Sequence, residues 1–171
     1  MQFEPQTQMK TTILNEKKRT KNRERPMSLE ENKEIVRRFI EAYNKQNLDI
    51  FDDLVAPDFV DHTHQQQGLK KLKKIFHEAY IGFPDLHETI EDIIAEGDKV
   101  WARLTYTATH TGEYLGLAPT GKKIKTTLIA IYRIVNGKIA EGLFFSDQLG
   151  FLKPLGAIEF TEKGKKLFPQ G

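Results

Sequence analysis

The spacing of hydrophobic positions changes near residue 86 and divides the chain into a helical part and a strand part. Ser28 and Glu31 form the S-x-x-E capping pattern, and apolar residues then recur at helical spacing as far as Gln46. A second stretch of helical spacing covers residues 68–83, with lysines on its opposite face. These two stretches predict two long amphipathic helices.

The segment between them predicts a shorter helix and a first extended piece. The sequence NLDIFDDLVAPDFV, residues 47–60, favours a short helix that ends before Pro57, because proline disfavours the helical conformation in the residue before it. Residues 59–62 then read as extended, and the polar HTHQQQG that follows reads as a loop.

From residue 86 onward the spacing follows the period of two that is typical of strands. Asn136-Gly137 is the strongest short hairpin signal in the chain. A short helix is expected at residues 149–155, and the last dozen residues show no pattern. Four long strands are predicted, over residues 86–96, 99–109, 122–135 and 138–147. About three helices followed by an antiparallel meander predict an α+β fold, with helices packed on one face of one sheet around a single cavity.

The loop between the second and third of these strands is unusually long. Residues 110–121 read HTGEYLGLAPTG, whereas hairpin loops usually have about two to five residues. Glycine allows turns with positive φ, and Tyr114 with Leu115 can close over an opening. We interpret this loop as the rim of the cavity, which controls access and does not perform chemistry.

Composition narrows the class of protein. A chain of 171 residues with 39% hydrophobic and 29% charged residues suits one soluble globular domain. No apolar run approaches the ~20 residues of a membrane span, so we expect a cytoplasmic protein. The absence of cysteine excludes disulfides, thiolate nucleophiles and cysteine-ligated metals. Any metal would need His, Asp and Glu ligands, and no HExxH-type spacing supports one.

Charge is distributed unevenly along the chain. Residues 1–27 contain seven basic and three acidic residues, although the net charge of the whole chain is only +2. We interpret this segment as a disordered basic extension, and residues 28–171 as the single domain. The alternative is a nucleic-acid-binding arm, which is not expected because the body lacks a basic stripe interleaved with aromatic residues.

Several short motifs together resemble a known family. These are Phe83-Pro84-Asp85 after the second long helix, HTGEYLGLAPTG between two strands, the VNGKI turn and the final DQLGFLKPLG. Their order over residues 28–157 resembles the SnoaL-like polyketide cyclase and ester cyclase group of the nuclear transport factor 2-like superfamily. The resemblance implies a cone-shaped fold with a curved sheet, a deep apolar pocket, a homodimer through the outer face of the sheet and no cofactor.

The sequence departs from that family at the positions that matter for its chemistry. The resemblance places the acid/base aspartate of the family on Phe144, and a histidine of the same pocket on Ala130. A phenyl ring cannot transfer a proton. Two hypotheses remain. One is an enzyme that acts by proton transfer, cyclisation or isomerisation on a hydrophobic carbonyl compound. The other is a binding or dimerisation module that kept the pocket and lost catalysis.

Three residues are candidates for remaining acid/base chemistry: Asp147, His62 and His110. Asp147 ends the last strand, where a helix N-cap is the favoured alternative. Asp61, His62 and His64 form the motif DHTH, which could bind a metal or form an acid/base pair, and we expect His62, at the end of the extended piece, to face the pocket. His110 begins the long loop and is equally consistent with a structural histidine.

The predicted pocket and interface follow from strand alternation and the resemblance. Trp101 and Arg103 are expected on the outer face of the sheet, where an exposed tryptophan suits a subunit interface. An aromatic cavity favours a flat, lipophilic ligand, and the alternative for aromatic residues at this spacing is simple core packing. The predicted pocket lining comprises Phe39, Tyr43, Phe59, Phe76, Tyr80, Phe83, Tyr106, Leu128, Tyr132 and Phe144.

Overall fold

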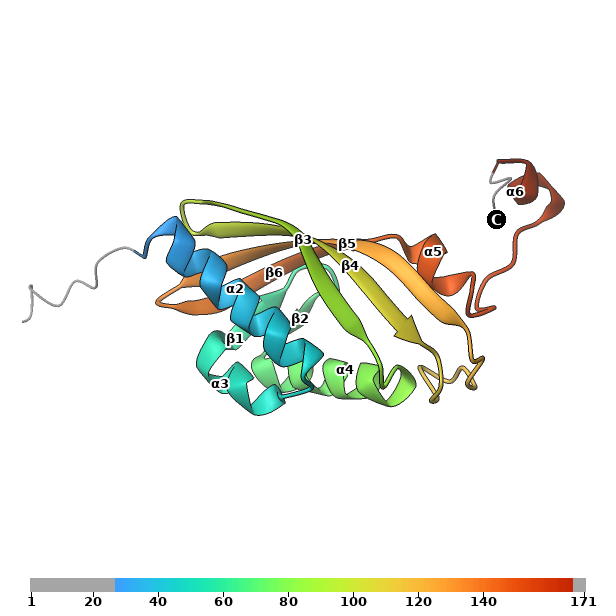
Figure 1. Cartoon of the computed structure of the whole chain (residues 1–171), viewed down its shortest axis with the longest axis horizontal. Coiled ribbons are helices and arrows are strands. Elements are labelled where there is room, and N and C mark those ends of the chain that lie inside the picture. The colour runs from blue at the N-terminus through green and yellow to red at the C-terminus, as the bar shows by residue number, and fades with distance from the viewer. Residues whose placement is uncertain (1–26, 168–171) are drawn as a thin grey trace, which may run out of the picture.

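The computed structural model describes residues 27–167 and has an α+β architecture, as the sequence predicts (Figure 1). The predicted basic extension lies outside the described residues except for Met27. Six strands form one curved sheet in the order β2-β1-β6-β5-β4-β3. Helices α2, α3 and α4 lie together on one side of it (Figure 1).

The first helix, α2 (Leu29–Asn44), begins where the capping pattern predicts. The Ser28 hydroxyl accepts a hydrogen bond from the Glu31 backbone N–H at 3.2 Å, and the Glu31 carboxylate accepts one from the Ser28 N–H at 2.7 Å. This reciprocal pair satisfies two backbone donors at the helix start. The apolar stripe of α2, which includes Ile35, Val36 and Phe39, is buried in the core.

The next segment contains more strand than the sequence predicts. A 3₁₀ turn (Leu48–Ile50) and α3 (Phe51–Leu54) end before Pro57, as expected, but β1 (Val55–Asp61) already begins at Val55. It pairs in parallel with β6, and in antiparallel fashion with the two-residue β2 (Gln66–Gln67), which was not predicted. Helix α4 (Leu69–Gly82) follows.

The four predicted long strands are confirmed, with small differences at their ends. They are β3 (His87–Glu96), β4 (Lys99–Thr109), β5 (Lys123–Val135) and β6 (Lys138–Ser146). Asn136 and Gly137 both have positive φ, 50° and 75°, in the β5–β6 turn. This is the conformation that favours Asn-Gly in two-residue hairpins.

Two short helices follow the sheet. Helix α5 (Gln148–Leu152) is close to the predicted position, whereas α6 (Glu162–Leu167) was not predicted. Figure 1 shows α6 set apart from the body, and it has no buried residue. No helix within residues 27–167 is long and apolar enough to cross a membrane.

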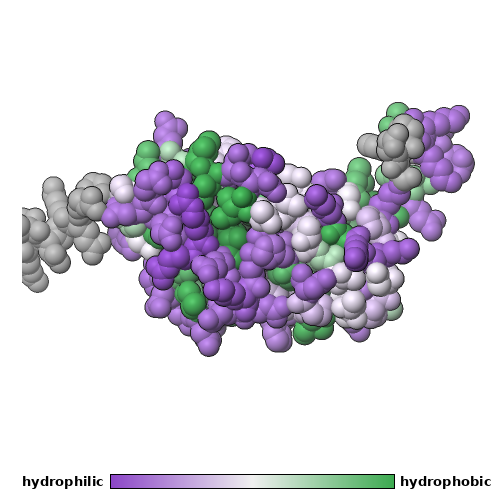
Figure 2. All heavy atoms as spheres, in the orientation of Figure 1, coloured by the Kyte–Doolittle hydropathy of each residue, from purple (hydrophilic) through white to green (hydrophobic). Residues whose placement is uncertain are grey.

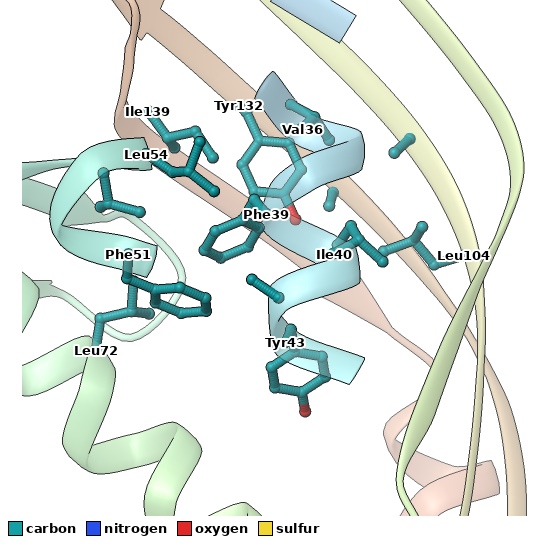
Figure 3. Packing of buried hydrophobic residues seen from close by; sticks show 14 of the residues in the cluster. Val36, Phe39, Ile40, Tyr43, Phe51, Leu54, Leu72, Leu104, Tyr132 and Ile139 are labelled. Carbon is teal, nitrogen blue, oxygen red and sulfur yellow. The ribbon is translucent and has the colours of Figure 1, made fainter. Parts of the chain in front are cut away.

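The core lies between α2, α3 and the inner face of the sheet (Figure 3). Phe39 on α2 is central: its ring centroid lies 4.7 Å from that of Phe51 on α3 and 5.8 Å from that of Tyr132 on β5. Such tilted and edge-on aromatic pairs add stabilisation beyond the burial of apolar area. This packing fixes α2 against the sheet and so defines one wall of the site.

The two faces of the sheet differ. Alternate residues of β4 such as Val100, Ala102 and Leu104 are buried, whereas Trp101 is 45% exposed on the outer face. Cross-strand pairing places four outer apolar residues in one continuous line over β3, β4, β5 and β6: Ile94, Trp101, Ile131 and Leu143. We call these four residues the outer apolar row. On the face shown in Figure 2, by contrast, hydrophilic side chains predominate and hydrophobic ones occupy smaller areas.

Candidate functional site

A cavity lies between α2, α4, α5 and the inner face of the sheet. It has two adjoining chambers, of about 180 and 370 Å³. The chambers share the residues that separate them, so we treat them as one cavity. The shared residues are Tyr43, His64, Ile75, Phe76, Glu88, Leu128, Ser146 and Gln148.

Glu88 is the acidic residue that lines both chambers. It lies on the inner face of β3, opposite Tyr106 on β4, which in turn lies opposite Thr126 on β5. Asn44, at the end of α2, holds this point of β3: its Oδ1 accepts from the Glu88 N–H at 2.7 Å and its Nδ2 donates to the Glu88 carbonyl at 2.8 Å. The helix end thus positions the backbone of Glu88, while its carboxyl group projects into the cavity.

The surroundings of the Glu88 carboxyl group favour its neutral form. No group within residues 27–167 donates a hydrogen bond to it. Burial raises the pKa of Glu88 to about 7. Burial also raises the pKa of Tyr43 and Tyr106, and the neighbouring Glu88 charge adds to both shifts. A carboxyl group with a pKa near neutrality can both accept and donate a proton at physiological pH.

A second ionisable group that lines the cavity is His64, in the loop after β1. The Asp61 carboxylate is buried and accepts the backbone N–H groups of Thr63 and His64 on Oδ1, at 2.9 and 3.1 Å. Its Oδ2 lies 2.8 Å from His64 Nδ1. This turn directs His64, and not His62, toward the cavity.

His62 lies outside the cavity, contrary to the expected direction. Its Nε2 is 2.9 Å from Glu141 Oε2, and its side chain is half exposed. Glu141 also accepts from Arg133, and these two donors hold the pKa of its carboxyl group below its ordinary value. His62 therefore belongs to a surface charge network.

His110 is fully buried at the base of the long loop and does not line the cavity. Its ring packs against Phe83 at 5.1 Å between centroids, and its Nδ1 lies 3.1 Å from the Thr120 hydroxyl. Its Nε2 has no partner among the described residues. The predicted rim residues Tyr114 and Leu115 of the same loop do line the larger chamber.

Asp147 is a helix N-cap, which is the alternative to a role as an acid or base. Its Oδ1 accepts the Gly150 N–H at 2.9 Å, so it caps α5. It does not line either chamber. The capped helix contributes Phe151 and Leu152 to the larger chamber.

Most of the predicted aromatic lining surrounds the cavity. Phe59 and Tyr80 are the exceptions: both are buried in the core, and the Tyr80 hydroxyl donates to the Tyr43 carbonyl at 3.1 Å. The predicted residues that do line at least one chamber are Phe39, Tyr43, Phe76, Phe83, Tyr106, Leu128, Tyr132 and Phe144.

Two polar positions were missed or misassigned from the sequence. Glu88 is not among the candidates from the sequence. It lies two residues before Ile90 and so on the same face of the strand, and a glutamate on an apolar strand face is a signal that could have identified it. His64 was considered only as the weaker alternative to His62. Among residues 27–167, no three His, Asp or Glu side chains are arranged to hold a metal ion.

Comparison with known proteins agrees with this architecture. A curved sheet with helices over one face defines a nuclear transport factor 2-like α+β protein. The model of the SnoaL-like polyketide cyclase family matches residues 33–155, and the chain therefore belongs to that family.

Individual relatives are moderately similar over most of their length. Aklanonic acid methyl ester cyclase DauD from Streptomyces sp. strain C5 is 27% identical over 80% of this chain and 88% of its own. Among solved structures, AclR from Streptomyces galilaeus has a TM-score of 0.72 at 28% identity, covering 84% of this chain and 92% of AclR. TsrD from Streptomyces laurentii has a TM-score of 0.71 at 26% identity, covering 77% and 99%.

Proposed function

We propose that this protein binds a flat, hydrophobic carbonyl compound in the cavity and moves a proton on it, with Glu88 as the base. One observation carries the proposal. Glu88 is a carboxyl group in a mostly apolar cavity, without a hydrogen-bond donor among the described residues and with a pKa of about 7. A base of this kind can remove a proton from carbon next to a carbonyl group.

The family and the cavity support the kind of substrate. The relative from Streptomyces sp. strain C5 is named as a cyclase of a methyl ester, which is a carbonyl compound. Aromatic side chains on α2, α4 and β5 form flat apolar walls, and no lysine or arginine of residues 27–167 lines either chamber. Such a lining favours a neutral, planar molecule.

The test uses β-tetralone, a flat bicyclic ketone, in D₂O. Proton NMR follows the replacement of hydrogen by deuterium on the benzylic carbon next to its carbonyl group. We expect the protein to accelerate this exchange, and Glu88→Gln to lower the accelerated rate about 100-fold. Glu96→Gln, an exposed glutamate at the end of the same strand, is the matched control and should retain the rate. Unchanged exchange in Glu88→Gln would overturn the assignment of the base.

The second hypothesis is a non-catalytic binding protein. It is favoured by Phe144 and Ala130, which occupy the positions where the resemblance places the acid/base residues of the family. If β-tetralone broadens or shifts the cavity resonances while its exchange stays at the buffer rate, binding without catalysis replaces the proton-transfer proposal.

We also propose that a second copy of this chain covers the outer face of the sheet. The outer apolar row crosses four strands without interruption, and Ile94 at its end is 66% exposed. The charges beside it are already paired, Arg103 with Asp92 and Arg133 with Glu141. An apolar row flanked by paired charges can meet its own copy without repulsion.

A further inference from the structure

His64 and Glu88 approach one cavity from opposite ends of the sheet. His64 follows β1, near one edge, and Glu88 lies on β3, which forms the other edge. Both residues line both chambers. Because the sheet is curved, a ligand in the cavity has an ionisable group on each side.

The imidazole of His64 is held in one orientation. Asp61 accepts both the backbone N–H and the Nδ1–H of His64, and a carboxylate can only accept. Thr63, between them, donates to the Phe144 carbonyl at 2.9 Å and accepts from its N–H at 2.6 Å, which ties the loop to β6. The neutral imidazole is therefore the Nδ1–H form, with the Nε2 lone pair free of partners among residues 27–167.

The Asp61 carboxylate lies beside the ring, with its Oδ2 at 2.8 Å from His64 Nδ1. Other titratable groups that line the cavity are Glu88, Tyr43, Tyr106, Tyr114 and Tyr132. None of these groups is cationic.

We infer that the Asp61–His64 pair is a second proton-transfer site, which gives a proton to the carbonyl oxygen of the substrate while Glu88 takes one from the neighbouring carbon. The inference rests on the proposed function for the identity of the substrate. Asp61 acts as a positioning residue, and His64 Nε2 contacts the reacting oxygen.

The step is balanced within the site. The Glu88 carboxylate takes the proton from carbon, and the C–H electron pair becomes the carbon–carbon double bond. The carbonyl π pair moves to oxygen, which receives the proton of His64 Nε2. The ketone becomes its enol, Glu88 becomes a neutral acid and the imidazolium becomes neutral imidazole. The reverse step in D₂O returns a deuteron to carbon.

His62 provides a matched control for His64. Each histidine is hydrogen-bonded to a carboxylate and each is about half exposed, but only His64 lines the cavity. We expect His64→Gln to lower β-tetralone exchange at least about tenfold and to change its pH profile, because the variant lacks the group that gives a proton to the carbonyl oxygen. His62→Gln should keep both. A wild-type rate and profile in His64→Gln would overturn the inference.

A second measurement does not depend on turnover. In ¹⁵N NMR of the imidazole groups, β-naphthol, a planar molecule whose hydroxyl imitates the enol, should shift His64 Nε2 and leave His62 unchanged. Asp61→Asn should alter the tautomer that the His64 signals report. If β-naphthol shifts cavity methyl groups such as those of Leu128 but not His64 Nε2, the oxygen contact is wrong. If His64 responds but the wild-type protein exchanges no β-tetralone, the contact holds and the Glu88 proposal fails.

Discussion

Phe144 on β6 and Ala130 on β5 are direct cross-strand partners on the inner face of the sheet. These are the two positions where the resemblance places the acid/base residues of the family. A ring and a methyl group therefore adjoin each other, and this part of the wall is apolar. Glu88 and His64, the two residues proposed to move protons, enter the cavity from β3 and from the loop after β1.

The Phe144 ring contributes to both the wall and the fold. It lies 5.8 Å from the Tyr132 ring and covers Gly142, where an added Cβ would lie 2.6 Å from the ring. We expect Phe144→Ala to lower the free energy of unfolding by about 2 kcal/mol, because it removes a half-buried ring and enlarges the cavity. Urea denaturation measures this change. Leu149→Ala, at a 41% exposed position on α5, should cost less than about 1 kcal/mol, and equal losses would contradict the packing role.

Glu88 also predicts a dependence of stability on pH. Its pKa rises from an ordinary 4.5 to about 7 on folding, so the folded state binds more protons between these values. The contribution of Glu88 to the free energy of unfolding is therefore fully present below about pH 4.5. It decreases as the pH rises to about 7, because the unfolded state loses its proton first. We expect Glu88→Gln to lack this decrease in stability, because glutamine does not titrate.

The measurement is thermal or urea unfolding of both proteins at acidic and alkaline pH. Relative to the wild type, Glu88→Gln should gain roughly 1–3 kcal/mol between pH 4 and pH 8. Glu96→Gln, which is exposed on the same strand, should show no such gain. A difference between Glu88→Gln and wild type that does not vary with pH would mean that the carboxyl group titrates normally.

The long loop depends on a close approach of two backbones. Thr111 and Gly112 both donate their N–H groups to the Gly82 carbonyl, at 3.1 and 3.0 Å. A Cβ on Gly112 would lie 1.9 Å from the Ile81 carbonyl oxygen, and no side-chain rotation can relieve a clash with backbone. Gly112→Ala should thus detach the rim from α4 and expose Tyr114.

Gly116 allows a comparison within the same loop. It has a positive φ of 82° but no atom within 4 Å of an added Cβ, so Gly116→Ala should cost only about 1–2 kcal/mol of backbone strain. We expect a larger loss of unfolding free energy and faster proteolysis of the loop in Gly112→Ala. If the two variants behave alike, the contact with α4 does not hold the rim.

Sequence periodicity predicted the fold better than the site, and β3 shows why. Glu88 and Ile90 face inward before an irregularity in its pairing with β4, and Ile93 and Ala95 face inward after it. Because the bulge shifts the phase by one residue, simple alternation does not place Glu88 on the same face as Ile93. The long helices and the Asn-Gly turn, by contrast, depend on local signals, and these were confirmed.

The prediction of which histidine faces the cavity was wrong for a related reason. Strand alternation ends at Asp61, where its side chain accepts two backbone N–H groups and turns the chain. The direction of His64 depends on this turn and on the attachment of Thr63 to β6, a strand about 80 residues away in the sequence. Only the assembled sheet brings these residues together.

The outer apolar row predicts a homodimer that the single tryptophan of the chain can report. Trp101 lies in the row, so its fluorescence should shift to longer wavelength as dilution separates the subunits and exposes the ring to water. Ile94→Asp places a charge beside Trp101 and should give a monomer by analytical ultracentrifugation, with the long-wavelength emission at every concentration. Ile81→Asp is the matched control, because Ile81 is 52% exposed on α4, away from the row, and it should remain dimeric. A wild-type protein that sediments as a monomer, or an Ile94→Asp variant that stays dimeric, would show that the second copy does not bind at this face.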